Sequence, residues 1–257
     1  MTPMGAAARP FIFAWHFLTT IPLSRTHHEP TAPELAASMA WYSTVGLMLG
    51  GILALSDIVL NRVFAQEVVN ILLIVLLVSL TRGLHQDGLA DTLDGLAGGR
   101  TPVDRLSIMR DPRIGAMGAT GLFLSLILRY AGLMALPQSI RFPALICMPA
   151  LGRCAMVVLA WLVPYARTGG GLASPFLTHL SIVHVMGSTL VLTVAIMVGL
   201  GVTATIVTMI VSCIILLSIQ ALCRVFFGGI TGDTLGATNE IIEILFLLFI
   251  PLVLVLS

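Results

Sequence analysis

Apolar runs long enough to cross a bilayer constrain the fold of this chain more than any other feature. Of its 257 residues, 58% are hydrophobic and only 10% are charged, whereas soluble domains carry about 25% charged residues. A span needs about 20 apolar residues, and seven runs approach that length, at roughly 41–60, 66–84, 117–136, 142–163, 179–200, 203–223 and 241–257. We therefore expect an all-α polytopic transmembrane bundle of about seven spans, forming a single integral membrane domain over residues 1–257.

A shorter apolar piece, residues 10–23, precedes the first of these runs. It is too short to cross a bilayer, so it predicts an interfacial or re-entrant helix. No cleavage site of small residues follows it, so we expect no removed signal peptide.

The arginines predict which way the bundle faces. All thirteen basic residues are arginine. If the seven spans alternate in direction, nine arginines lie on one side of the membrane and two, Arg62 and Arg141, lie on the other, while Arg129 and Arg153 fall within spans. By the positive-inside rule, the arginine-rich side is cytoplasmic. Charged residues inside spans must pair within the bundle, but the sequence names no partner for Arg129 or Arg153.

Charge is concentrated in one stretch, residues 81–118, which holds ten of the 25 charged residues. Read as a helix, this stretch places Asp91 about 40° from Asp87 and Asp94 about 20° on the other side, so the three carboxylates share one face. Like charges at these spacings repel each other, and a divalent cation would remove that cost. Oxygen ligands without a cysteine partner favour Mg²⁺ or Mn²⁺ over zinc.

A second polar stretch, residues 228–243, falls on the same predicted cytoplasmic side. As a helix it would carry one acidic face with a glycine gap, formed by Asp233, Gly236, Glu240 and Glu243. Gly88 leaves the first acidic helix bare beside its carboxylates, so a second helix or a phosphate can come close. Two acidic helices facing one cavity would suit phosphoryl chemistry with bound cations. The alternative is that the glycines only break the helix and the acids face water.

Other polar residues offer candidate roles, each with a simpler alternative. Arg110 and Arg113 lie beside glycine-rich backbone and suit a phosphate or pyrophosphate, or else a lipid headgroup or an Arg–Asp pair. Arg167 precedes three glycines and is either a phosphate donor or an interfacial anchor. His85 lies two residues before the first aspartate and could act as a base or a phosphate ligand. Asp104 is typical of a helix cap.

Four segments together resemble the signatures of the bacterial cobalamin synthase family, the adenosylcobinamide-GDP ribazoletransferases. They are GLHQDGLADTLDGL (Gly83 to Leu96), IMRDPRIGAMG (Ile108 to Gly118), GGITGDTLGATNEIIE (Gly228 to Glu243) and the early piece FLTTIPL (Phe17 to Leu23). The resemblance spans the whole chain.

This resemblance implies a Mg²⁺-dependent enzyme of the last steps of cobalamin biosynthesis. It would be a multi-pass protein of the bacterial inner membrane, embedded in the lipid bilayer with its active site facing the cytoplasm. It would join adenosylcobinamide-GDP to α-ribazole, or to α-ribazole 5′-phosphate. The products would be adenosylcobalamin, or its 5′-phosphate, and GMP.

Residue chemistry and the family reaction together give a set of expected roles. The expected metal ligands are Asp87, Asp91 and Asp94, completed by Asp233 and Glu240. The expected substrate and phosphate contacts are Arg110, Arg113, Arg167, Thr231 and Asn239. The expected catalytic residues are His85 and Asp94, because a base is needed near the attacking hydroxyl.

Two other functions fit parts of the pattern. A CDP-alcohol phosphotransferase of phospholipid synthesis also has spaced aspartates beginning Asp-Gly-x-x-Ala, but Asp91 stands where that family has arginine. A membrane transporter could use acids on broken helices, although the acids here cluster at one membrane side and no internal repeat is evident. No basic aromatic patch indicates nucleic-acid binding.

Overall fold

The computed structural model of the chain describes residues 8–23, 29–171 and 173–253. Over these ranges the fold is helical, as the apolar runs predict, apart from one isolated bridge between Tyr165 and Ile230. The predicted span 241–257 continues past residue 253, so its last four residues lie outside the described part of the chain.

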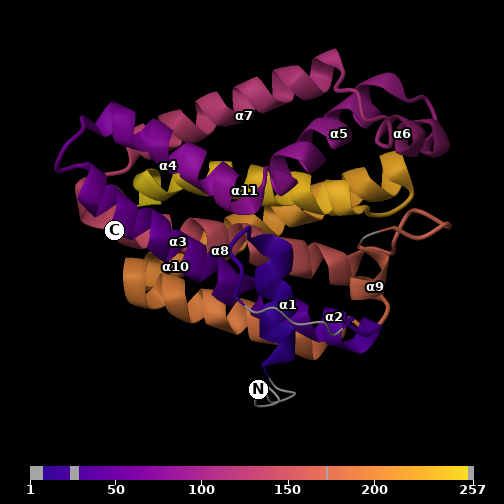
Figure 1. Cartoon of the computed structure of the whole chain (residues 1–257), viewed down its shortest axis with the longest axis horizontal. Helices are drawn as coiled ribbons and strands as arrows, with labels where there is room; N and C mark the ends of the chain where they lie inside the picture. Colours follow the sequence, from indigo (N-terminus) through magenta and orange to yellow (C-terminus); the bar gives the residue numbers. More distant parts are fainter. Residues whose placement is uncertain (1–7, 24–28, 172, 254–257) are drawn as a thin grey trace.

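The long helices run roughly side by side along the long axis of the molecule (Figure 1). The short helices α6 and α9 lie near one end of this axis, and α11 ends near the other. A single turn of 3-10 helix, Met39–Trp41, joins α2 to α3. In chain order the α-helices are α1 (Arg9–Leu18), α2 (Ala32–Ser38), α3 (Tyr42–Leu60), α4 (Gln66–Thr81), α5 (Leu84–Gly98), α6 (Pro102–Ile108), α7 (Ala116–Ala135), α8 (Gln138–Leu162), α9 (Ser174–Leu177), α10 (Ile182–Phe227) and α11 (Gly232–Val253).

Several helices are long and apolar enough to cross a membrane. α4 and α5 together qualify as a sixth span, bent by 88°. Large apolar side chains such as Phe123 on α7 and Val198 on α10 are exposed on the outside of the bundle, where lipid tails would cover them. The protein is therefore a multi-pass helical membrane protein. The five candidate spans outside the bent pair are Ala32–Leu60, Ala116–Ala135, Gln138–Leu162, Ile182–Phe227 and Gly232–Val253.

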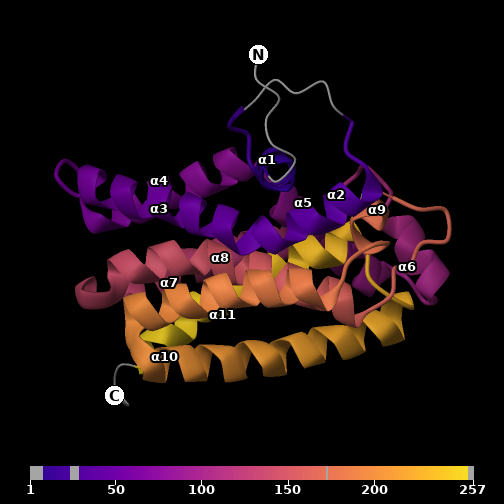
Figure 2. The same ribbon diagram turned by 90° about the horizontal axis from the view of Figure 1, so that it is seen from below.

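The shape of α10 explains why this count is below the seven predicted spans. Its 46 residues form one element, but Gly201 interrupts the helical backbone with φ 87° and ψ 174°. Thr189 and Met209, which lie on opposite sides of Gly201, line the same cavity against α8. Figure 2 shows α10 folding back on itself. Its two arms correspond to the spans predicted at 179–200 and 203–223.

The N-terminal piece forms the short helix α1 and an extended segment after it. The Trp15 indole Nε1 donates to the carbonyl of Ile21 at 2.8 Å. The backbone N–H of Thr20 donates to the carbonyl of Leu80 at 2.7 Å, at the end of α4. Figure 2 views α1 end-on while the long helices cross the picture, so α1 is steeply inclined to them. The predicted short helix is confirmed, and it is anchored to the junction between α4 and α5.

α8 forms the centre of the bundle, where it packs against α3, α10 and α11. Two glycines let α3 approach it closely. A Cβ on Gly46 would lie 2.7 Å from the backbone nitrogen of Ala150, and a Cβ on Gly50 would lie 2.6 Å from the carbonyl oxygen of Leu145. Small residues at such crossings let membrane helices make close backbone contact.

A buried ion pair joins α3, α4 and α8 near the end of the molecule where α11 ends. Arg141 is only 2% exposed, and its Nη2 donates to Asp57 Oδ1 at 2.8 Å and also to Asn70 Oδ1. The predicted arrangement of spans placed Arg141 outside the membrane, on the side with few arginines. Its guanidinium instead bonds inside the bundle, because α8 begins before it and Asp57 faces it from α3.

Candidate active site

A sharp turn between α4 and α5 sets the direction of the first acidic helix. Arg82 and Gly83 both adopt left-handed backbone conformations, with φ of 54° and 64°. The Gly83 N–H donates to the carbonyl of Val78 at 3.0 Å, which closes the end of α4. Two successive left-handed residues end α4 and turn the chain sharply. α5 therefore leaves α4 at 88°.

Two glycines bring α5 and α11 into contact. A Cβ on Gly88 would lie 2.6 Å from the carbonyl oxygen of Asp233. A Cβ on Gly236 would lie 3.3 Å from the Cα of His85 and 3.4 Å from the Cα of Gly88. Any larger residue at Gly88 would push the helices apart. The prediction that the two polar stretches face each other across glycine gaps is confirmed.

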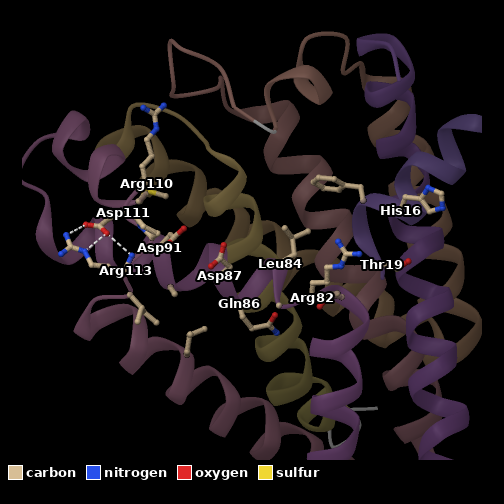
Figure 3. A pocket seen from close by; sticks show the side chains of 18 residues that line it. His16, Thr19, Arg82, Leu84, Gln86, Asp87, Asp91, Arg110, Asp111 and Arg113 are labelled. Atoms are coloured by element: carbon tan, nitrogen blue, oxygen red, sulfur yellow. Dashed lines mark hydrogen bonds and ion pairs between the residues drawn. The ribbon is translucent and has the colours of Figure 1, made fainter. Parts of the chain in front are cut away.

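Asp87 and Asp91 lie on one face of α5 and line a cavity of about 830 Å³ (Figure 3). Asp87 is exposed and Asp91 is half-buried. Neither carboxylate accepts a hydrogen bond from any residue that the structure describes. Two like charges four residues apart on a helix repel, so this face of α5 favours a bound cation.

Asp94 has a structural role that the sequence did not predict. Its two carboxylate oxygens accept hydrogen bonds from the backbone N–H groups of Gly115 and Gly118, both at 2.7 Å. These N–H groups belong to the first turn of α7, where they have no partner within the helix. Asp94 therefore caps α7 from a neighbouring helix, and both of its oxygens are taken.

Replacing Asp94 with alanine is expected to destabilise the fold by about 1–2 kcal/mol, because losing a helix cap has that cost. Thermal unfolding of the purified protein in detergent would measure the change. Asp91→Ala is the matched control, since Asp91 has no hydrogen-bond partner in the described chain, and it should leave the unfolding temperature nearly unchanged. Equal unfolding temperatures for the two variants would contradict the capping role of Asp94.

The first turn of α11 uses its polar side chains internally. Thr231 Oγ1 accepts a hydrogen bond from the Thr234 N–H at 3.2 Å, and the Thr231 N–H donates to Thr234 Oγ1 at 2.8 Å. Asp233 Oδ2 accepts from Arg167 Nη2 at 2.8 Å. Thr231 and Arg167 were both predicted to contact substrate. In this structure Thr231 caps α11, and Arg167 neutralises the charge of Asp233.

A charge network buried between α7, α8 and α11 includes Glu240 and Asn239, two more of the predicted site residues. Arg129 donates to Glu240 and to Glu243, both at 2.8 Å, and Arg153 also pairs with Glu243. Asn239 Nδ2 donates to Glu243 Oε1 at 3.0 Å. These side chains are at most 2% exposed. Glu240 and Asn239 therefore bond inside the bundle rather than facing a ligand, and the buried arginines have found their partners.

The arginines around the large cavity differ in whether they are free to bind an anion. Arg113 Nη2 donates to Asp111 Oδ2 at 2.7 Å, and these hydrogen bonds lower the pKa of Asp111 to about 2. Arg110 and Arg82 line the same cavity and have no side-chain partner in the described part of the chain. Arg82 was not predicted to belong to the site. The sequence signal that could have identified Arg82 is its position immediately before Gly83, where the acidic helix begins.

His85 does not line the large cavity. It is 2% exposed, and its Nε2 has no hydrogen-bond partner among the described residues. Together with Asp87, it lines a second, smaller cavity. A buried polar atom without a partner is costly, so Nε2 is free to bond a ligand.

The acidic residues fit a magnesium site, but with fewer protein ligands than predicted. No three Asp, Glu, His or Cys side chains within the described ranges converge to hold an ion. Mg²⁺ is commonly bound through one or two carboxylates together with substrate phosphates and water. Asp87 and Asp91, which are both unpartnered and face one cavity, meet that requirement. Asp94 and Glu240 fit it less well, because each of their carboxylate oxygens already accepts a hydrogen bond.

Comparisons with known proteins cover nearly the whole chain. The family described as cobalamin-5-phosphate synthase matches residues 10–251. An adenosylcobinamide-GDP ribazoletransferase of Syntrophobacter fumaroxidans is 39% identical over 91% of this chain and 94% of its own length. Relatives of the same name from Desulforamulus reducens and Chlorobaculum tepidum are 37% and 32% identical, over 82% and 90% of this chain and 84% and 91% of their own lengths. No solved structure matches. The chain belongs to the cobalamin-5-phosphate synthase family.

Proposed function

We propose that this protein transfers the cobinamide-bearing phosphate of adenosylcobinamide-GDP to a hydroxyl of α-ribazole, or of α-ribazole 5′-phosphate. The products are adenosylcobalamin, or its 5′-phosphate, and GMP. The observation that carries the proposal is the crossing of α5 and α11 at Gly88 and Gly236. On the same helix α5, the unpartnered carboxylates of Asp87 and Asp91 lie beside a large cavity that unpaired arginines also line. The family of the chain supports the same reaction.

Asp87 and Asp91 would hold Mg²⁺, or Mn²⁺ in its place, with the pyrophosphate of the substrate completing the coordination. When bound, such a cation neutralises the pyrophosphate and stabilises the charge that develops on the leaving GMP. Asp233 lies next to Asp87 along the wall of the second cavity, and its pairing with Arg167 keeps it out of this minimal set. Asp94 supports the site indirectly, because its cap fixes the start of α7.

Phosphate binding is assigned to the arginines that have no partner. Arg110 and Arg82 line the cavity that holds Asp87 and Asp91, and guanidinium groups suit phosphate oxygens. Arg113 is kept near Asp111 by its ion pair, so we give it a smaller part. These cations would orient the diphosphate so that the phosphorus bearing cobinamide faces Asp87.

The transfer needs a group that takes the proton of the attacking hydroxyl. The hydroxyl oxygen bonds to the cobinamide-bearing phosphorus, and the bond from that phosphorus to the bridging oxygen breaks as GMP leaves. His85 is our candidate for the proton, because its Nε2 is unpartnered at the wall of the second cavity. We prefer His85 to Asp94, whose two carboxylate oxygens each accept a backbone N–H.

The experiment that tests the function measures GMP release by the purified protein in detergent. Adenosylcobinamide-GDP and Mg²⁺ should yield GMP only when α-ribazole is also present, and a corrinoid carrying ribazole should appear in equal amount. Release of GMP without α-ribazole would indicate a hydrolase. Turnover of CDP-diacylglycerol instead would move the protein to the CDP-alcohol phosphotransferases.

Removal of divalent cations is expected to stop the reaction. EDTA should abolish GMP release, because Asp87 and Asp91 would then meet the pyrophosphate with no positive charge between them. Mg²⁺ in excess should restore it, and EDTA already saturated with Mg²⁺ is the control. Full turnover in free EDTA would rule out a metal at these aspartates.

We also propose that the active-site end faces the cytoplasm of a bacterial cell, with the protein in the inner membrane. The arginine distribution along the chain supports this orientation. In intact cells, a membrane-impermeant maleimide should label Val63→Cys, in the exposed turn between α3 and α4, but not Arg100→Cys, between α5 and α6. Labelling of the two positions with the opposite pattern would reverse the orientation.

A further inference from the structure

A second cavity lies beyond Asp87 from the large one. Its volume is about 180 Å³, which is below the size of cavities that hold a whole drug-sized ligand. The two cavities share Phe17, Leu84 and Asp87 in their walls. The smaller cavity therefore suits one flat ring system, held next to whatever occupies the larger one.

Aromatic rings and methionines form a large part of the apolar wall of this cavity. The Phe17 ring lies 4.8 Å from that of Phe176 and 6.3 Å from that of Tyr42, measured between centroids. Met39 and Met156 add flexible, polarisable side chains. Aromatic faces bind flat heteroaromatic rings well. Phe17 belongs to the N-terminal segment Phe17 to Leu23, which the proposed function leaves without a role.

The remaining wall is polar and lies toward α5. His85 lines it, and its buried Nε2 has no hydrogen-bond partner in the described chain. Arg167 and Asp233 also line the cavity, but they neutralise each other. Among the described lining residues, Asp87 carries the one acidic charge without a pair, so the rest of the cavity does not require a charged ring. It suits a neutral heteroaromatic ring that carries hydroxyl groups at one edge.

We propose that this second cavity binds the base of the acceptor nucleoside, with its ribose directed toward Asp87. The inference rests on the proposed function, in which the acceptor is α-ribazole, a nucleoside of a methylated benzimidazole. A methylated benzimidazole has an apolar outer edge, which matches the wall formed by Phe17, Phe176 and Met156. Guanine is the competing occupant, but its edge of hydrogen-bond donors and acceptors would meet mostly apolar side chains.

This arrangement gives each substrate its own compartment. The diphosphate occupies the large cavity with Asp91 and Arg110, the acceptor base occupies the small one, and Asp87 lies in the wall that both share. A hydroxyl of the ribose can then reach the phosphorus without either substrate crossing the other. The hydroxyl forms the new bond to phosphorus, GMP departs with the bridging oxygen, and the hydroxyl proton is released to water in the large cavity.

The test is the binding of α-ribazole to the purified full-length protein, by equilibrium dialysis, combined with steady-state kinetics. Phe176→Ala should raise the Kd and the KM for α-ribazole about tenfold or more, because base stacking on an aromatic ring is worth that much. The KM for adenosylcobinamide-GDP should not change. The matched control is Phe123→Ala, on the exposed outer face of α7, which should alter neither constant.

A second variant covers the case in which Phe176→Ala fails to fold. Ala173→Phe fills the cavity from the loop before α9 and should weaken α-ribazole binding while the protein keeps its unfolding temperature. A rise in the KM for adenosylcobinamide-GDP alone would place the guanine base here and overturn the inference. Unchanged constants for both substrates would also overturn it. Failure of the wild-type protein to release GMP would reject the proposed function, whereas dialysis would still report whether the cavity binds α-ribazole.

Discussion

Asp91→Asn is expected to lower the rate of GMP release by at least about a hundredfold, while the protein still inserts and folds. Loss of a hydrogen-bond partner of a metal ligand already costs about 10- to 100-fold, and losing a ligand itself should cost more. Asparagine keeps the shape of the side chain but removes the charge that a cation requires. Stability should not fall, because Asp91 accepts no hydrogen bond from the described residues and is repelled by Asp87.

The control for this substitution is Asp104→Asn, which removes the same charge from the start of α6. Asp104 Oδ2 accepts from the Thr101 N–H at 3.0 Å and takes part in a capping box, away from the two cavities. Its activity should stay near that of the wild-type protein. Near-normal turnover of purified Asp91→Asn would reject Asp91 as a ligand.

Arg129→Met is expected to destabilise the protein by about 3–5 kcal/mol, because it leaves a buried carboxylate without a partner. Arg129 bonds both Glu240 and Glu243, and the network as a whole balances two arginines against two glutamates. Thermal unfolding in detergent would measure the loss. Arg100→Met, at an exposed arginine, is the control and should change the unfolding temperature little.

A paired substitution separates lost charge balance from lost packing. Arg129→Met combined with Glu240→Met removes one charge of each sign, so it should recover a large part of the stability that Arg129→Met alone loses. Gln86 on α5 donates to Glu240 Oε1 at 3.2 Å. The double variant would therefore also test whether the network stabilises the position of α5. If the double variant were as unstable as the sum of the single ones, charge balance would not be the cause.

The sequence was a good guide to the elements and to where two of them meet. Apolar runs predict the spans because a bilayer admits few other structures. Gly88 and Gly236 predict a close crossing because each leaves a gap beside the acids on its own helix. Both inferences depend on local properties of a single segment, and the structure confirms both. Even the two arms of α10 follow from the apolar runs on either side of Gly201.

The role of each carboxylate could not be predicted in the same way. Asp94 lies on the same helical face as Asp87 and Asp91, yet the start of α7 comes to it and takes both oxygens. Glu240 shares a face with Asp233, yet it meets Arg129 from α7. A carboxylate bonds a cation, an arginine or a helix end with similar chemistry. Which of these partners a carboxylate bonds depends on which one the tertiary fold places beside it. Helical periodicity contains no information about that placement.

The backbone of Arg82 has a consequence for how this chain could change over time. A residue with a β-carbon in the left-handed conformation costs about 1–2 kcal/mol, and glycine carries no such penalty. Selection for heat tolerance alone should therefore favour Arg82→Gly, which relaxes the turn between α4 and α5. Selection for efficient use of scarce substrate should keep the arginine, whose guanidinium faces the large cavity. Populations evolved under the two regimes should diverge at this codon.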